Sequence, residues 1–335
     1  MQKARPASTL QPSRPVGYAV RMLRRALFAL AALATLVAFV FLARAWAPDR
    51  PVDDLKARWA PAPSQFLDVD GLLVHYRDVG PREDPTPLVL LHGTSASLHT
   101  WEGWVARLSP SRRVVTLDLP GFGLTGAPAD GDLSIPHTLK TLHALLAKLG
   151  VSQCIVAGNS YGGRIAWEYA LVHRDEVKGL VLVDAAGYPL QSKSVPLGFR
   201  IARMSSLRVI TEKLLPRSVI EKSVRNVYGD PSLVTPELVD RYYELTLREG
   251  NRAALVKRFE QVPLIGDTAQ LKTLTTPTLI LWGAKDELIP PENARRFADD
   301  LPNDTLVMFD ALGHVPQEEA PDVSVAALQR WLAAQ

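Results

Sequence analysis

Short apolar runs alternate with amphipathic segments along most of this chain, and their spacing predicts strands and helices in turn. Continuous apolar runs bounded by Gly, Pro or charged residues are typical of buried strands. They lie at residues 88–91, 113–117, 154–157, 179–183, 278–281 and 305–308. Apolar residues three and four apart predict helices at residues 101–108, 139–149, 163–173, 293–301 and 323–332. Because buried strands separated by helices form parallel sheets covered on both faces, we predict an α/β fold with a mostly parallel sheet.

Two stretches depart from this alternation. Residues 66–69 and 72–76 flank Asp70-Gly71, a dipeptide typical of tight hairpin turns, so an antiparallel hairpin is expected there. Residues 188–259 carry no strand pattern, only helical spacing such as Val209-Ile210 followed by Leu214-Leu215. We therefore predict a helical cap at 188–259, inserted between core segments 64–187 and 260–335.

The N-terminal region has a different character. Residues 26–43 form an unbroken apolar run whose only polar member is Thr35, just long enough to cross a bilayer as a helix. A cleaved signal peptide, loosely suggested by Ala43-Arg44-Ala45, and a buried core helix are the alternatives. The basic residues of segment 1–25 favour a cytoplasmic N-terminus, which would place the remainder in the periplasm or outside the cell. Residues 44–63, which contain four prolines, are expected to be an exposed linker.

Composition and charge narrow the choice of function. The chain has 335 residues, of which 47% are hydrophobic and 22% charged, enough for a large core. Segment 1–25 holds six of the 38 Lys and Arg residues and no acid, which leaves 32 basic against 35 acidic residues elsewhere. No basic surface for nucleic acid is expected on the folded body. The single cysteine, Cys154, lies in an apolar strand and is expected to be a small buried residue.

The pentapeptide Gly158-Asn159-Ser160-Tyr161-Gly162 has the form G-x-S-x-G, and it lies between a predicted buried strand and a predicted helix. Such a sharp turn exposes the serine hydroxyl at the carboxyl end of the sheet, and the glycines remove side chains that would collide there. On its own the motif is also compatible with an ordinary turn carrying a surface serine. A serine hydroxyl needs a base and an orienting acid to act as a nucleophile at neutral pH.

Two of the seven histidines, His92 and His314, lie in loops directly after predicted buried strands. Ligand-facing residues collect at this end of such sheets. His314 is the predicted base because it follows the other members of the triad in the chain order typical of G-x-S-x-G enzymes. His92 is expected instead to brace the loop whose backbone faces the substrate.

Asp286 is the predicted acid, because it follows the strand before that of His314 and completes the order Ser160, Asp286, His314. Glu287, the next residue, and Asp184, at the end of the strand after the serine motif, are the alternatives.

A tetrahedral oxyanion needs two N–H donors, which we assign to the backbones of Tyr161 and Thr94. Residues 121–126 also spell G-x-G-x-x-G, but a loop rather than a helix follows, so they are not expected to bind a dinucleotide. The chain has no HExxH, Cys/His cluster or P-loop, and therefore no metal or other cofactor is predicted.

Taken together, these motifs resemble those of the α/β-hydrolase family. The shared elements are His92-Gly93, residues 118–123, the serine motif, residues 283–286 and Gly313-His314, all in family order. The resemblance covers nearly all of residues 64–332 and implies an α/β-hydrolase fold. Within the family the chain looks most like bacterial serine lipases and esterases, and next like C–C bond hydrolases of ring-cleavage products.

The expected activity is therefore hydrolysis of carboxylic esters through an acyl-enzyme. Apolar residues of the cap favour an uncharged acyl chain, so we expect esters of short to medium acyl chains, as a small-molecule or lipid-like substrate. The alternatives are C–C hydrolysis of a dienoate, whose carboxylate could use Arg200, Arg203 or Arg208, and a non-catalytic binding protein on the same fold.

Overall fold

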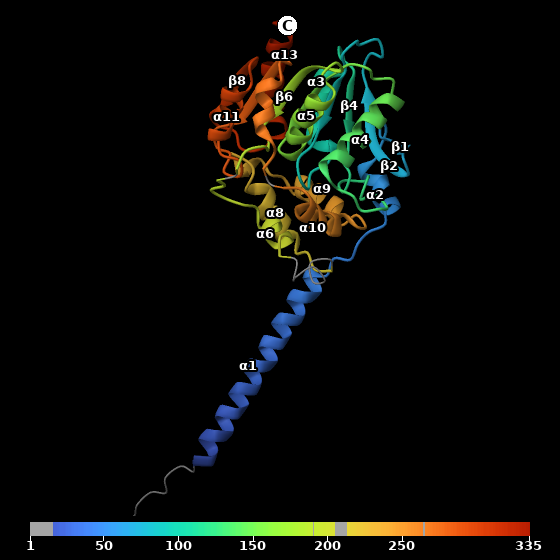
Figure 1. Cartoon of the computed structure of the whole chain (residues 1–335). Coiled ribbons are helices and arrows are strands. Elements are labelled where there is room, and N and C mark those ends of the chain that lie inside the picture. Colours follow the sequence, from blue (N-terminus) through green and yellow to red (C-terminus); the bar gives the residue numbers. More distant parts are fainter. Residues whose placement is uncertain (1–15, 190, 205–212, 264) are drawn as a thin grey trace, which may run out of the picture. The chain divides into compact units, whose positions relative to one another are not determined.

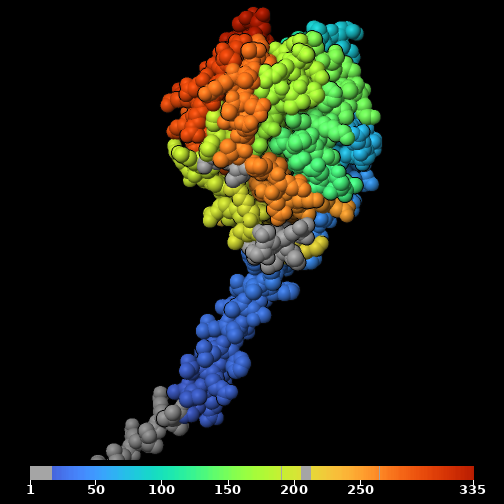
Figure 2. Space-filling view, viewed as in Figure 1, coloured from blue at the N-terminus to red at the C-terminus, as the bar shows by residue number. Residues whose placement is uncertain are grey.

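The computed structural model describes residues 16–189, 191–204, 213–263 and 265–335, and it divides the chain into two compact units between Trp46 and Ala47. The first unit contains the helix α1 (Val16–Ala45), whose residues 17–44 are exposed (Figure 2). Gly17–Ala45 is long and apolar enough to cross a membrane, with a mean hydropathy of 2.7. The helix begins before the predicted apolar run because arginine is also a good helix former, and Arg21, Arg24 and Arg25 lie within it.

The second unit is built on one eight-stranded sheet (Figure 1). Its order is β1-β2-β4-β3-β5-β6-β7-β8; β1 and β2 pair antiparallel, β2 and β4 pair antiparallel, and all other neighbours are parallel. The strands are β1 (Gln65–Val69), β2 (Leu72–Val79), β3 (Leu88–Leu91), β4 (Val114–Leu117), β5 (Cys154–Asn159), β6 (Val177–Val183), β7 (Thr278–Gly283) and β8 (Asp304–Phe309). The predicted mostly parallel α/β sheet and the hairpin at Asp70-Gly71 are confirmed.

Helices cover both faces of this sheet. One face packs against α4 (Ile135–Lys148), α5 (Tyr161–Val172) and α11 (Glu292–Asp300). The other packs against α3 (Glu102–Leu108), which follows the short helix η1 (Leu98–Trp101), and against α13 (Pro321–Ala333), which follows α12 (Pro316–Glu319). Cys154 is buried between sheet and helices as expected, and burial raises the pKa of its thiol to about 12.

In the described part of the chain between β6 and β7, four further α-helices occur, and we call them the cap helices. They are α6 (Leu197–Ala202), α8 (Arg217–Arg225), α9 (Pro236–Thr246) and α10 (Asn251–Gln261), and they gather beyond one end of the sheet (Figure 1). The described part of residues 188–259 contains no strand. Val209-Ile210 lies outside the described residues.

The expectation of an exposed linker at residues 44–63 was wrong for much of its length. Residues 52–59 form the helix α2 (Val52–Trp59), and the compact unit already begins at Ala47. Leu55 is fully buried against Leu124 and Leu245, with Val52 and Trp59 packed alongside. These apolar residues are spaced three and four apart along one helical face, a pattern that the surrounding prolines concealed.

Candidate active site

Ser160 lies at the sharp turn between β5 and α5, where its φ of 56° and ψ of −117° depart from ordinary backbone geometry. A Cβ atom on Gly158 would lie 2.1 Å from the carbonyl oxygen of Gly162, so the turn requires a glycine there. The Ser160 N–H donates to the carbonyl of Val183 on the neighbouring strand, at 3.0 Å. This strained backbone is held in place by the surrounding sheet, and Ser160 lines the cavity described below.

His314 and Asp286 form a buried pair. Nδ1 of His314 lies 2.6 Å from Oδ2 of Asp286, and the two residues are 4% and 2% exposed. The other carboxylate oxygen of Asp286 accepts the N–H groups of Leu288 and Ile289, at 2.8 and 2.9 Å. Because both oxygens have donors, the carboxylate is fixed in the orientation that holds the imidazole.

Asn159 connects the serine turn to the histidine loop. Its side-chain amide donates to the carbonyl of His314 at 2.9 Å and to that of Val183 at 3.1 Å. Ser160 and His314 both line one cavity of about 150 Å³. The structure thus brings the predicted nucleophile, base and acid together from loops that follow β5, β8 and β7.

The two alternative acids have different environments. Glu287 is exposed to solvent. Asp184 is fully buried, and Oδ1 accepts the N–H of Gly283 at 2.9 Å, while Oδ2 has no partner among the described residues. Burial, followed by the neighbouring charge of Asp286, raises the pKa of Asp184 well above its ordinary value. Polar atoms of Asp184, Asp286 and His314 lie within 4.8 Å of one another, so two carboxyls share this corner, and their proximity favours the protonated form of Asp184.

His92 has no free nitrogen for base catalysis. Nδ1 donates to the carbonyl of Gly93 at 2.7 Å, and Nε2 accepts the N–H of Leu119 at 2.9 Å. Burial lowers the pKa of His92, so the ring is neutral and its tautomer is fixed by these two bonds. It braces the loop after β3, as the sequence indicated.

That loop lies directly against the nucleophile. A Cβ on Gly93 would meet the side-chain oxygen of Asn159 at 2.9 Å and Cβ of Ser160 at 3.1 Å. Thr94 lines the cavity with Ser160, and Tyr161 is the first residue of α5, where a backbone N–H has no acceptor within the helix. Both predicted donor residues therefore lie next to Ser160.

The cavity wall is mainly apolar, and the cap helices and the turns beside them supply much of it. The residues from this part of the chain include Pro196, Phe199, Ile201, Leu214, Leu215, Val219, Ile220, Val224, Leu255 and Val256. Of the three arginines considered for a carboxylate, Arg200 and Arg203 are exposed and do not line the cavity, and Arg208 lies outside the described residues.

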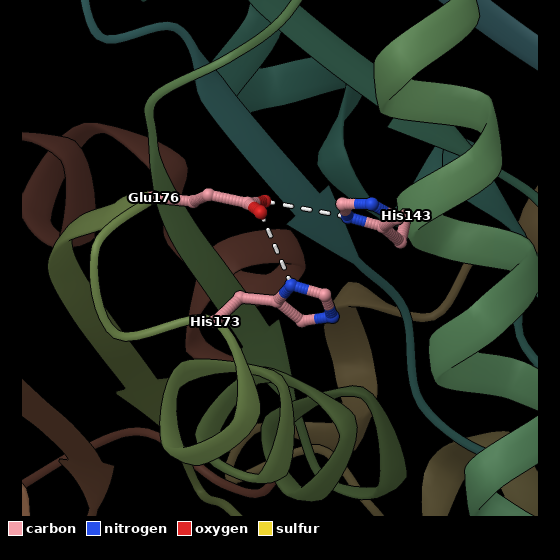
Figure 3. A group of neighbouring side chains, drawn as sticks. All are labelled: His143, His173 and Glu176. Carbon is pink, nitrogen blue, oxygen red and sulfur yellow. Dashed lines mark hydrogen bonds and ion pairs between the residues drawn. The ribbon is translucent and has the colours of Figure 1, made fainter.

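A second cluster of polar side chains lies outside the cavity. His143 of α4, His173 after α5 and Glu176 before β6 point toward one another (Figure 3). Glu176 pairs with His143 at 3.4 Å and His173 at 3.2 Å, and it accepts the Tyr169 hydroxyl at 3.0 Å. The imidazole rings stack 4.3 Å apart with only 15° between their planes, so an ion in the plane of one ring lies outside the plane of the other. This geometry is that of a hydrogen-bonded cluster rather than a metal centre.

Comparison with known proteins identifies the family. A model of the alpha/beta hydrolase fold matches residues 86–321. The chain belongs to the α/β-hydrolase family. It is 27% identical to Lipase 1 of Psychrobacter immobilis over 250 residues, which covers 70% of this chain and 73% of the lipase. A 2-hydroxymuconate semialdehyde hydrolase of Pseudomonas sp. (strain CF600) is also 27% identical, over 70% of this chain and 82% of its own.

Among solved structures, a membrane phospholipase A described as a bacterial virulence factor is similar, with a TM-score of 0.70 and 26% identity. The match covers 94% of this chain and 98% of the phospholipase. These similarities establish a hydrolase of the α/β fold. Lipases and ring-cleavage product hydrolases both lie among its relatives, so the family alone does not select the bond that is cleaved.

Proposed function

We propose that this protein is a serine hydrolase that cleaves carboxylic esters through an acyl-enzyme intermediate. The observation that carries the proposal is that His314, held by the buried carboxylate of Asp286, lines one apolar cavity together with Ser160. Ser160 attacks the ester carbonyl while His314 takes its proton and Asp286 stabilises the imidazolium. The proton then passes to the departing alcohol, and water repeats the sequence to release the acid.

The backbone N–H groups of Thr94 and Tyr161 are the proposed oxyanion donors. Two preorganised donors aimed at the developing charge are each worth about 3 to 4 kcal/mol in comparable sites. The position of Tyr161 at the start of α5 adds the positive end of the helix dipole.

The cavity wall supports an uncharged acyl chain as the preferred substrate group, because burial of methylene groups against Leu, Val and Ile provides binding energy without a polar partner. A C–C bond hydrolase acting on a dienoate is the second candidate, favoured by the similarity to a 2-hydroxymuconate semialdehyde hydrolase. Arg200 and Arg203, which were expected to bind its carboxylate, do not line the cavity, and Arg252, which does, pairs with Asp49; this weighs against that candidate.

We further propose that α1 anchors the protein as a single membrane span, with the second unit outside the cytoplasm. The apolar length of Gly17–Ala45, the arginines at its N-terminal end and the similarity to a membrane phospholipase A support this arrangement. A phosphatase fused after residue 63 should be active, and an inactive fusion would reverse the proposed orientation. Separately, a mature chain that starts near Trp46 would show that the apolar helix is a cleaved signal.

The decisive experiment compares wild type with Ser160→Ala on p-nitrophenyl esters of increasing chain length and on a 2-hydroxy-6-oxo-dienoate. We expect ester turnover in the wild type and loss of at least about 10³-fold in kcat in the variant. Unchanged turnover in Ser160→Ala would refute the serine mechanism. A kcat/KM for the dienoate that exceeds the ester values by orders of magnitude would replace the ester reaction with C–C hydrolysis.

A further inference from the structure

The side chain of Arg258, in cap helix α10, is buried beside the two proposed oxyanion donors. The residue is 4% exposed, and Nη2 donates to the Oγ1 of Thr94 at 2.9 Å. The central carbon of the guanidinium lies 4.3 Å from the ring centre of Tyr161. One cation therefore contacts both residues whose backbone N–H groups are the proposed oxyanion donors.

This cation has no carboxylate partner among the described residues. The rings of Phe122 and Phe259 complete its surroundings at 5.2 and 5.1 Å, and Nε is buried without a hydrogen-bond acceptor. Of the titratable groups that act on it, the Tyr161 hydroxyl favours its charged form, whereas Arg164 and Arg203 repel it. Burial lowers the pKa of Arg258 to about 10, so the guanidinium remains charged at neutral pH.

Burying an unpaired charge is unfavourable, and aromatic faces offset only part of the lost hydration. The positive charge also acts on the neighbouring loop, since it contributes to lowering the pKa of His92. What the resting site lacks is an anion, and the tetrahedral intermediate creates one at the oxyanion position. An interaction that is stronger in the transition state than with the bound substrate raises kcat rather than lowering KM.

We propose that Arg258 is a positioning residue of the oxyanion hole, which fixes Thr94 and Tyr161 and supplies a positive charge behind their N–H groups. The inference rests on the proposed serine mechanism. Arg258 does not line the cavity, so it acts through the two donor residues and not by contact with the substrate. It also connects the cap to the catalytic core, because α10 carries the side chain and the loop after β3 receives it.

The test uses the full chain and compares Arg258→Met, a neutral side chain of similar length, with Arg258→Lys, which keeps the charge. We expect Arg258→Met to lower kcat by about 10- to 100-fold, less than the loss of a direct donor, with KM unchanged. Arg258→Lys should recover part of this loss. The affinity for a trifluoromethyl ketone, which forms an oxyanion on Ser160, should fall in parallel with kcat/KM.

Arg203→Met is the matched control, because Arg203 is exposed and faces the same Phe259 ring at 5.0 Å without touching Thr94. It should keep wild-type kinetics. Thr94→Val keeps the backbone N–H but removes the acceptor of Arg258, so it should lower kcat several-fold in the wild type and have no further effect beside Arg258→Met. This second variant tests the proposal even if Arg258→Met fails to fold.

Wild-type kcat in a folded Arg258→Met or in Thr94→Val would overturn the proposal, as would a change in KM alone. A fall in kcat of the same size in Arg203→Met would overturn it too, because the effect would then be one of general charge. Failure of the serine mechanism is recognised separately, because only then does Ser160→Ala retain turnover.

Discussion

At the scale of single residues, environment rather than residue type separates the two aspartates beside His314. Asp286 receives two backbone N–H groups on one oxygen and the imidazole on the other, which fixes the orientation of its carboxylate. Asp184 receives one N–H and is buried against the charge of Asp286, which favours the protonated form. Only the charged carboxylate can stabilise an imidazolium during the reaction.

This difference predicts that replacing each aspartate by asparagine will lower kcat to very different extents. Asp286→Asn should lower kcat by about 10⁴-fold, as loss of the triad carboxylate does in a serine protease. Asp184→Asn should change kcat less than about tenfold, because a neutral amide of the same shape replaces a carboxyl whose protonated form is favoured by burial. Steady-state kinetics on one p-nitrophenyl ester measure kcat for both variants. A large loss of kcat in Asp184→Asn alone would mean that Asp184, and not Asp286, is the acid of the triad.

The pH dependence of stability provides the control for the protonation of Asp184. A carboxyl whose pKa is raised by folding binds more protons in the native state than in the unfolded state. Its contribution to stability is complete below the unfolded pKa of about 3.9 and is lost as the pH rises toward the folded value. Asp184→Asn should remove the contribution of this carboxyl to the fall in unfolding free energy with rising pH. Urea unfolding at pH values from about 3.9 upward measures this difference.

At the scale of elements, the short apolar runs were sufficient to predict the core strands, since a strand buried on both faces needs apolar residues throughout. The first residues of the helices were harder to predict from the sequence than the strands. The helix α4 begins at Ile135, four residues before the predicted start, because Ser134 caps it and Pro136 occupies its first turn. The helix α2 was missed altogether, because Pro51 lies immediately before it and Pro61 and Pro63 follow it.

The residues of the candidate site also divide into those that the sequence predicted and those that only the structure shows. Ser160, Asp286 and His314 were predictable because each follows a recognisable strand in a fixed chain order. Arg258 lies in a cap helix with no motif around it, and only the folded chain brings it to Thr94. The raised pKa of Asp184 depends on its burial and on the proximity of Asp286, neither of which sequence spacing conveys.

The buried face of α2 gives a prediction at this scale. Leu55→Ala removes a fully buried side chain and should reduce the free energy of unfolding by about 2 to 5 kcal/mol. Leu73→Ala is the control, because Leu73 is 46% exposed and should cost less than about 1 kcal/mol. Urea unfolding in detergent measures the loss of unfolding free energy in both variants. Equally small losses would mean that residues 52–59 are only weakly attached, as expected of a linker.

At the scale of the whole molecule, the boundary of the catalytic unit lies closer to α1 than the sequence indicated. Asp49 forms an ion pair with Arg252 in α10, and the N–H of Ala47 donates to the carbonyl of Lys213 at 2.9 Å. Arg50 forms an isolated parallel β-bridge with Arg248. The segment before β1 therefore packs on the cap region. Residues 47–63 contribute to the stability of the part of the molecule that roofs the cavity.

Two truncations test this boundary. A chain that starts at Ala47 keeps every described contact within the second unit and should fold without α1, with kcat/KM on a water-soluble p-nitrophenyl ester within about twofold of the full chain. A chain that starts at Ser64 loses α2 and the Asp49–Arg252 pair, which exposes Leu124 and Leu245 and leaves the buried Arg252 without the Asp49 carboxylate. We expect it to unfold at lower urea concentration and to lose activity through disorder of the cap, as measured by unfolding curves and by the fall in kcat/KM. Equal stability and activity of the two truncations would show that the catalytic unit begins at Ser64 after all.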